Sequence, residues 1–301
     1  MALTFLNLHN NYEDHTGDTT AANITIGKNR INDTYKELLA LHDWYFAETT
    51  APFIPTANDY TYDVPYNFGR AIAIRIDVDD VHYVLEEVAS HEEWQKLQIH
   101  RDTQTSNYPT HFHITADRFE IYPIPSSTAS TATGTIHYVQ RVVDMSEDDY
   151  TTGTATATNA SAAVTGASTV WTAAFVGRFF KINADKRWYE ISARSSDTAI
   201  TLKKAFQGTT ASAVTYTIGE IPLIPEDYHN LLWYQPVAQY WMMKKETDQA
   251  AYYQALYDKG KKDFFNAYSK RTRSQILNPI GMVRRRPITA YGSPIWDEPG
   301  F

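Results

Sequence analysis

The chain has 301 residues, no cysteine, 43% hydrophobic and 14% aromatic residues, and a formal net charge of −8. The aromatic content predicts a sizeable buried core, the lack of cysteine excludes disulfides and thiolate chemistry, and the negative charge excludes a globally basic nucleic-acid binder. No signal peptide precedes the first elements and no window approaches the roughly 20 apolar residues of a membrane span. We therefore expect a soluble protein with no membrane contact, made in a cytoplasm.

The first predicted element is an amphipathic helix over residues 31–46. Its apolar side chains recur at steps of three and four, which places them on one helical face, and the charged side chains fall mostly on the other. We expect the helix to end near Thr49–Thr50, because the residue before Pro52 is disfavoured in the α region.

Alternating patterns then predict antiparallel strands. Residues 60–64 and 71–78 alternate between apolar and polar side chains, with a turn at residues 65–69 between them. Ser90 and Glu93 form a capping-box pattern at the start of a short helix. Further strands are predicted at residues 111–115, 118–124 and 135–143.

The composition changes sharply near Tyr150. Of the 25 residues from 151 to 175, 16 are Thr or Ala, which favours strands or a disordered linker. We favour a small inserted all-β module over residues 144–219, because aromatic residues are present to give it a core: Trp171, Phe175, Phe179, Phe180, Trp188 and Tyr189. Its predicted strands are residues 162–165, 179–182, 188–192, 199–202 and 214–218.

Helices return after this segment. Pro225, followed by two acidic residues, predicts a helix start, and Pro236 should kink the helix. A second helix is predicted from Glu246 to Arg271, with Tyr253, Tyr257, Phe264 and Tyr268 on one face.

The last 31 residues predict an extended tail without a core of its own. Residues 270–286 hold six basic side chains and no acidic one, and residues 287–301 hold three prolines and two glycines. The basic run is compatible with contact to nucleic-acid phosphates, with docking on an acidic protein surface, or with a solvated tail. We favour docking on a partner, because the last residues are too apolar to remain in water. The proposed docking residues are Arg271, Arg273, Arg284, Arg285, Arg286, Tyr291, Trp296 and Phe301.

Few residues suggest catalysis, and no nucleophile elbow, Walker A loop, dinucleotide fingerprint or HExxH motif occurs. His111 and His113 would share one face of a strand and could share a metal, but we favour exposed strand positions beside buried Phe112 and Ile114. Asp77, Asp79 and Asp80 form an acidic group that we expect to lie in a solvated turn. Glu92 and Glu93 could be catalytic carboxylates, but the helix-capping role already explains Glu93. We expect no catalytic residue, no metal and no cofactor.

The order of these elements resembles the tailed-phage head-to-tail adaptor, or connector, family. The resemblance lies in the helix Ile31-Asn32-Asp33-Thr34-Tyr35-Lys36-Glu37-Leu38-Leu39 with Asp43-Trp44-Tyr45-Phe46, the strand pair 60–65 and 68–76, the hairpin 109–125, and the return helix from Ile224-Pro225-Glu226-Asp227-Tyr228. It covers residues 25–143 and 220–270.

The resemblance implies a non-enzymatic virion protein with an α+β fold. Residues 1–143 and 220–270 would form a core of helical bundle and antiparallel strands, residues 144–219 an inserted β module, and residues 271–301 a docking tail that grips the portal protein. Such adaptors form a homo-oligomeric ring, usually of twelve copies, that joins the portal to tail or fibre proteins in the virion neck, with DNA passing through the channel.

Three other functions remain open from the sequence. A tail-tube or tail-hub protein would have a fold dominated by strands. A carbohydrate-binding virion module would expose Trp171, Trp188 or Tyr189 on a flat face. A metal-dependent hydrolase would use His111 and His113.

Overall fold

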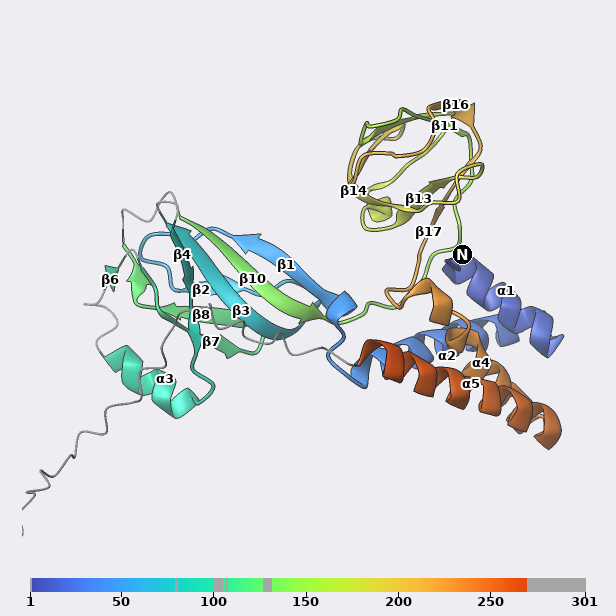
Figure 1. Cartoon of the computed structure of the whole chain (residues 1–301), viewed down its shortest axis with the longest axis horizontal. Coiled ribbons are helices and arrows are strands. Elements are labelled where there is room, and N and C mark those ends of the chain that lie inside the picture. The colour runs from blue at the N-terminus through green and yellow to red at the C-terminus, as the bar shows by residue number, and fades with distance from the viewer. Residues whose placement is uncertain (1, 79–80, 100–104, 107, 127–131, 270–301) are drawn as a thin grey trace, which may run out of the picture. The chain divides into compact units, whose positions relative to one another are not determined.

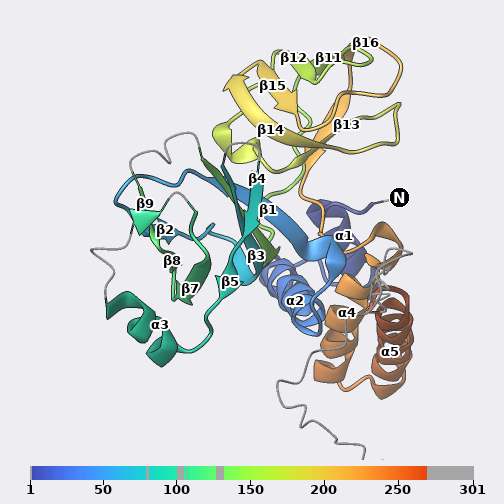
Figure 2. The same cartoon turned by 60° about the vertical axis from the view of Figure 1, so that its left-hand side comes forward.

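The computed structural model describes residues 2–78, 81–99, 105–106, 108–126 and 132–269, and it has the α+β fold class predicted from the sequence (Figure 1). Four helices pack together, α1 with α2 and α4, and α4 with both α2 and α5 (Figure 2). Their bounds are Phe5–Thr16 for α1, Ala21–Ala40 for α2, Leu231–Met243 for α4 and Thr247–Tyr268 for α5. No helix in these residues combines the length and apolar character needed to cross a membrane.

Helix α1 was not predicted, and local hydrogen bonds account for both of its ends. Thr4 and Asn7 form a reciprocal capping box at its start, and Gly17 adopts a left-handed conformation with φ of 67° at its end. Helices α1 and α2 approach so closely that a Cβ atom added at Gly27 would lie 2.5 Å from the ring of Tyr12. Glycine at this position therefore permits the contact between the two helices.

The predicted bounds of the first long helix were wrong at both ends. Helix α2 begins at Ala21, where Thr20 caps it by accepting a hydrogen bond from the backbone N–H of Asn23. It ends at Ala40 because the indole N–H of Trp44 donates to the carbonyl of Leu38 at 3.1 Å, which takes an acceptor that a longer helix would need. A 3-10 turn, η1 (Tyr45–Ala47), follows and leads directly into strand β1.

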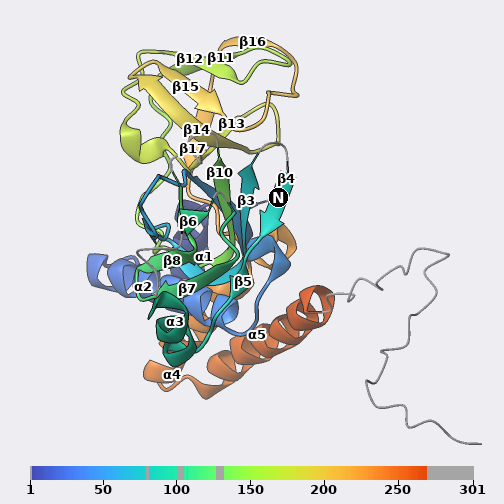
Figure 3. The same cartoon turned by 90° about the vertical axis from the view of Figure 1, so that its left-hand side faces the viewer.

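The strands before residue 141 form two four-stranded sheets. The first is antiparallel in the order β1-β10-β3-β4, and the second has the order β2-β8-β7-β5 with β5 parallel to β7. Figure 3 shows β10, β3 and β4 of the first sheet and β8, β7 and β5 of the second. The bounds in the first sheet are Glu48–Phe53 for β1, Thr133–Gln140 for β10, Phe68–Val78 for β3 and Val81–Val84 for β4. Those in the second are Thr61–Asp63 for β2, Arg118–Tyr122 for β8, His111–Thr115 for β7 and Glu86–Glu87 for β5. Helix α3 (His91–Leu97) and a two-stranded pair, β6 (Thr105–Ser106) and β9 (Ile124–Pro125), complete this part.

Strand β3 departs once from the predicted alternation. Ile74 and Ile76 are buried as expected, but Ile72 is 43% exposed. The register shifts at this point, since Ala73 pairs with His137 while Ala71 pairs with Tyr138. Ile72 is therefore the extra residue of a β-bulge and points away from the core.

Residues 154–219 form a seven-stranded antiparallel sheet in the order β16-β11-β12-β15-β14-β13-β17, in place of the disordered linker considered from the sequence. The bounds are Thr154–Ala157 for β11, Ala163–Ala167 for β12, Phe179–Ile182 for β13, Tyr189–Ser196 for β14, Ala199–Leu202 for β15, Ala211–Val214 for β16 and Tyr216–Gly219 for β17. This sheet has its own hydrophobic cluster. Four of the six aromatic residues expected to form its core are buried, and Phe179 and Trp188 are half-buried.

The return helix starts later than predicted. Pro225 is followed by a 3-10 turn, η5 (Glu226–Tyr228), and α4 begins only at Leu231. Hydrogen bonds from the backbone N–H of His229 to Glu226 and from that of Leu232 to His229 tighten this turn and delay the α-helix. Helix α4 then continues through Pro236.

Candidate functional site

An aromatic cluster holds the C-terminal end of α5, which ends at Tyr268, two residues before the segment predicted to dock. Phe264 and Trp44 are completely buried, with ring centroids 4.5 Å apart. Phe46, Tyr228 and Tyr268 surround Phe264 with centroid distances of 6.1, 5.2 and 5.7 Å. We call these five residues the α5 anchor. They join the turn after α2, the turn before α4 and the end of α5, so that the chain leaves α5 from a fixed position.

The rim of the α5 anchor is apolar and exposed. Tyr45 is 51% exposed and Phe265 and Leu41 are each 42% exposed. The Tyr45 ring contacts Tyr268 and the Phe265 ring contacts Trp44, so these side chains extend the cluster to the surface. An exposed apolar rim at the end of α5 is a candidate contact surface.

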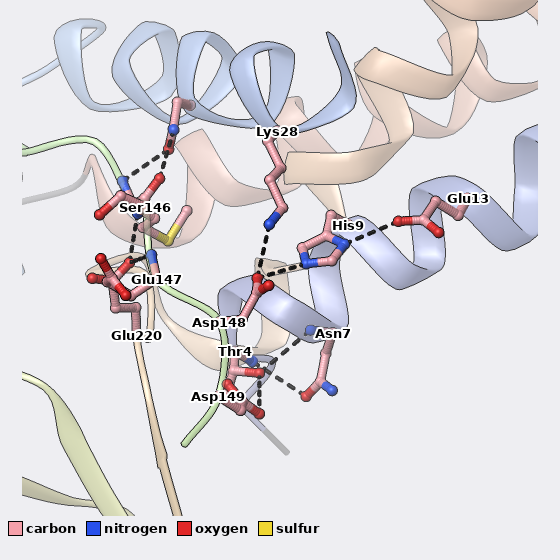
Figure 4. A network of polar contacts seen from close by, with 12 residues as sticks. Thr4, Asn7, His9, Glu13, Lys28, Ser146, Glu147, Asp148, Asp149 and Glu220 are labelled. Atoms are coloured by element: carbon pink, nitrogen blue, oxygen red, sulfur yellow. Dashed lines mark hydrogen bonds and ion pairs between the residues drawn. The ribbon is translucent and has the colours of Figure 1, made fainter. Parts of the chain in front are cut away.

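A second candidate feature is the polar network around residues 145–149 and Glu220, which we call the linker junction (Figure 4). Here the chain passes from β10 into β11 and from β17 towards α4. Asp148 Oδ1 accepts a hydrogen bond from Lys28 Nζ at 2.8 Å and lies 3.0 Å from Nε2 of His9. Nδ1 of the same imidazole lies 3.1 Å from a carboxylate oxygen of Glu13. His9 is 5% exposed, so it is a buried polar group with a partner for each ring nitrogen.

The charge of Asp148 is stabilised by these partners. Partial burial raises the pKa of its carboxyl group, but the hydrogen bonds from Lys28 and His9 outweigh the burial and leave the pKa below its ordinary value. The Asp148 carboxylate therefore attaches the linker from β10 to β11 to both α1 and α2.

Backbone groups of residues 145–147, in the linker from β10 to β11, also form hydrogen bonds. Asn32, on α2, donates to the carbonyl of Met145 at 2.9 Å and accepts from its N–H at 3.0 Å. The Glu220 carboxylate accepts from the N–H groups of Ser146 at 2.7 Å and Glu147 at 3.1 Å. Both linkers are thus attached to each other and to the helices (Figure 4).

Asp149 is in a less favourable environment than Asp148. Its Oδ2 accepts from Thr4 Oγ1 at 2.9 Å, while Oδ1 is buried without a hydrogen-bond partner. Burial raises the pKa of this carboxyl group, and the hydrogen bond from Thr4 and the nearby Arg178 only partly oppose the rise.

His229 is a buried neutral histidine at the start of the return helix. It is 1% exposed, its Nδ1 accepts from the N–H of Leu3 at 2.9 Å, and its Nε2–H donates to the carbonyl of Ile224 at 2.8 Å. Burial lowers the pKa of this imidazole, and the neutral tautomer satisfies both neighbours. His229 therefore has a structural role that explains its burial.

The prediction that His113 occupies an exposed strand position was wrong. His113 is 6% exposed, because α3 packs against β7 and the Trp94 ring stacks on the imidazole with centroids 5.5 Å apart. His111 lies next to Thr110, whose hydroxyl is 2.7 Å from its Nδ1, and does not contact His113. Within the described parts of the chain, no group of three or more His, Asp or Glu side chains is arranged to hold a metal ion.

The eight predicted docking residues lie outside the described residues: Arg271, Arg273, Arg284, Arg285, Arg286, Tyr291, Trp296 and Phe301. Sequence reasoning found several members of the α5 anchor as apolar helix positions but missed their assembly into one cluster. It also missed the linker junction, although Thr4 and Asn7 at capping spacing could have revealed α1.

The comparisons with known proteins now identify the family. The family model of the SU10 adaptor protein matches residues 3–190, more than half of the chain. The chain therefore belongs to the SU10 adaptor protein family, in agreement with the predicted phage head-to-tail adaptor family. It is a phage structural protein of the adaptor class, which interacts with other virion components. No curated protein sequence matches the chain significantly.

Proposed function

We propose that this protein forms a homo-oligomeric ring that joins the phage portal to tail components, and that it acts structurally rather than as an enzyme. The observation that carries the proposal is the match to the SU10 adaptor protein family over residues 3–190. In this proposal the helices α1, α2, α4 and α5 build the ring, residues 144–219 form an inserted module, and residues 271–301 dock on the portal.

Exposed apolar residues on the helices support an interface between copies. Met242 and Met243, at the end of α4, are 62% and 57% exposed, and Tyr252, in the second turn of α5, is 59% exposed. Large apolar side chains in such exposed positions are unfavourable in water and favourable in an oligomer interface. If they contact a different surface of the next copy, the contact is heterologous, and repeated rotation closes it into a ring.

The charge distribution supports separate partners for separate segments. Residues 154–219 carry seven basic and three acidic side chains, whereas the whole chain has a net charge of −8. We propose that this segment faces acidic tail or fibre proteins, because charge complementarity favours and orients such encounters. The negative net charge suits a channel that DNA passes through without being held.

The α5 anchor supports the docking role of the last residues. The tail begins two residues after the end of α5, which is held by five packed aromatic side chains. A fixed starting point reduces the conformational entropy that the tail loses when it binds. Arg271, Arg273 and the run Arg284–Arg286 would pair with portal carboxylates, while Tyr291, Trp296 and Phe301 would fill apolar pockets.

Native mass spectrometry of the protein with and without portal tests the proposal. The full chain should join portal in a stoichiometric ring, twelve copies being the expected number, and a variant ending at Lys270 should not. A full-length variant with Arg284, Arg285 and Arg286 changed to alanine should bind weakly. The matched control, Lys186→Ala with Lys204→Ala at exposed positions of the inserted module, should bind portal like the unmodified chain. Monomers that ignore portal in every case would contradict the proposal.

The carbohydrate-binding alternative has little support from the side chains. Trp171 is fully buried and Tyr189 is 7% exposed, so neither can present a flat ring to a sugar. Trp188 is half-buried and carries Lys181 Nζ over its ring at 4.4 Å from the centroid. The long helices α4 and α5 likewise disfavour a tail-tube or tail-hub protein.

A further inference from the structure

A groove of about 680 Å³ lies between the inserted sheet and the segment that joins β17 to α4. One wall is formed by the loops that follow β13 and β15, and the other by residues 221–224. The backbone N–H of Lys203 donates to the carbonyl of Glu190 at 2.8 Å. The N–H of Gln207 donates to the hydroxyl of Tyr189 at 3.2 Å. These two hydrogen bonds hold the loops of the first wall side by side.

The wall formed by residues 221–224 is held by hydrogen bonds to the helical part of the chain. The N–H of Leu223 donates to the hydroxyl of Tyr35, on α2, at 2.7 Å. The imidazole of His229 donates to a carbonyl of the same segment at 2.8 Å. Ile221 and Leu223 are half-buried, so they leave an apolar strip along this wall. Because the wall is already held in place, a ligand that binds here orders little additional chain.

The opposite wall is basic. Lys186, Arg187 and Lys204 are exposed there. In the part of the chain that the structure describes, no carboxylate pairs with these three side chains, and neither lysine has a hydrogen-bond partner. Lys203 also lines the groove, but the Glu190 carboxylate neutralises it at 2.8 and 2.9 Å. Three uncompensated positive charges therefore face the groove, in a chain whose net charge is −8, and they attract an acidic ligand.

The other groups of the groove favour an acidic peptide over a nucleic acid. Single-stranded nucleic acids stack their bases on exposed aromatic rings. Here the Trp188 ring is covered by Lys181 Nζ, 4.4 Å from its centroid, and Tyr189 is only 7% exposed. The carboxylates of Glu190 and Glu226 also line the groove and would repel a phosphate backbone. A peptide can direct its N–H groups towards these carboxylates and its own acidic side chains towards the lysines.

We propose that this groove binds an extended acidic segment of a partner protein. Carboxylates of the segment pair with Lys186, Arg187 and Lys204, and its apolar side chains pack against Ile221 and Leu223. The charges favour acidic partners and orient them, and the apolar strip discriminates among them. The groove is then the surface through which the inserted module meets acidic tail or fibre proteins, so the inference rests on the function proposed above.

Fluorescence anisotropy of a short labelled peptide, rich in glutamate and also containing leucine, tests the groove on the full chain at low ionic strength. The unmodified chain should bind this peptide, and Lys186→Ala with Lys204→Ala should weaken binding about tenfold, because two charge-assisted contacts are lost. Both lysines are exposed, so the change spares the core. Lys259→Ala with Lys262→Ala, at exposed positions of α5, is the matched control, since it changes the net charge equally and should leave peptide binding unaltered. Replacing the leucines of the peptide by serine should weaken binding several-fold.

The outcomes separate the groove from other kinds of binding. No peptide binding by the unmodified chain, or equal weakening in the two double variants, would overturn the inference. Tighter binding of an oligothymidylate of equal charge would also overturn it, because the groove would then take nucleic acid. So would self-association of the unmodified chain that is lost in Lys186→Ala with Lys204→Ala, because the occupant would then be a second copy. Since this double variant should still join portal, a failure of peptide binding leaves the ring unaffected, and a failure of portal binding leaves the groove unaffected.

Discussion

Replacing Phe264 by alanine tests the α5 anchor directly. Phe264 has no exposed surface and contacts Trp44, Phe46, Tyr228 and Tyr268. Truncating a buried phenylalanine removes its transfer free energy and leaves a cavity, at a typical cost of about 3–5 kcal/mol. We expect a loss in that range, because the surrounding rings are large and rigid and cannot collapse into the space.

Phe265→Ala is the matched control for this change. The two residues are neighbours of the same type on the same helix, but Phe265 is 42% exposed, and its ring contacts Trp44 of the anchor and His42 outside it. Since nearly half of its side chain is already in water, its truncation should cost about 1 kcal/mol or less. The difference between the two variants isolates the effect of burial in the anchor.

Urea unfolding and hydrogen exchange together measure both effects. Phe264→Ala should lower the free energy of unfolding by about 3–5 kcal/mol, as estimated from buried truncations, and speed exchange of the amides in the last two turns of α5. It should also weaken binding to portal even where the protein remains folded, because the tail would start from a frayed helix. Equal losses in Phe264→Ala and Phe265→Ala, or unchanged exchange at the end of α5, would refute the reasoning about the anchor.

Two further predictions concern the turn before α4 and the inserted sheet. Burial lowers the pKa of His229, so below about pH 6.5 this imidazole gains a proton in the unfolded chain but not in the folded one, and the free energy of unfolding should decrease as the pH falls. In urea titrations between pH 7 and 5, His229→Gln should make the free energy of unfolding less dependent on pH. The same pH dependence in the variant and the unmodified chain would contradict this. The indole N–H of Trp171 donates to the hydroxyl of Tyr216 at 2.9 Å, so Trp171→Phe should lower the free energy of unfolding by about 1–3 kcal/mol. Thermal unfolding measures this loss, and hydrogen exchange in α5 should not change. An unaltered unfolding temperature would count against a stabilising role of this buried hydrogen bond.

Strand prediction succeeded best where a strand alternates regularly, whereas β1, β4 and β11 were not predicted, and the predicted strand 214–218 combines the end of β16 with most of β17. Residues 179–182 and 199–202 were predicted with the bounds that β13 and β15 have, because each strand alternates between buried and partly exposed side chains. The bulge at Ile72 was unpredictable, because it depends on the register that β10 imposes on β3.

Helix ends were less predictable, because side chains distant in the sequence decide them. The apolar periodicity continued past Ala40, but Trp44 folds back onto Leu38 and the residues from Glu48 pair with β10. Helix α1 has few apolar residues, so its periodicity is weak, and its caps at Thr4 and Gly17 carry most of the local signal. Tertiary contacts and capping here outweigh propensity.

The candidate sites were predictable only as separate residues. Sequence reasoning considered His113 together with His111, since strand alternation relates the two, whereas the structure pairs His113 with His91. That pairing depends on the parallel contact of β5 with β7, which places the start of α3 over the sheet. The α5 anchor likewise combines residues 44–46 with residues 228 and 264–268, and no local pattern relates segments so far apart.

The separate hydrophobic clusters suggest how one adaptor chain can serve several partners. The helical cluster includes Phe264 of the α5 anchor and also Met145 and Ile224, which adjoin the two linkers of the inserted sheet. The sheet over residues 154–219 and the sheets before residue 141 each pack a cluster of their own. A substitution in either of these two clusters should therefore perturb only the sheet that contains it. A substitution in the helical cluster should perturb both linkers and the end of α5 together. We therefore expect hydrogen exchange to be slowest in the helices, because both linkers of the inserted sheet are attached to them.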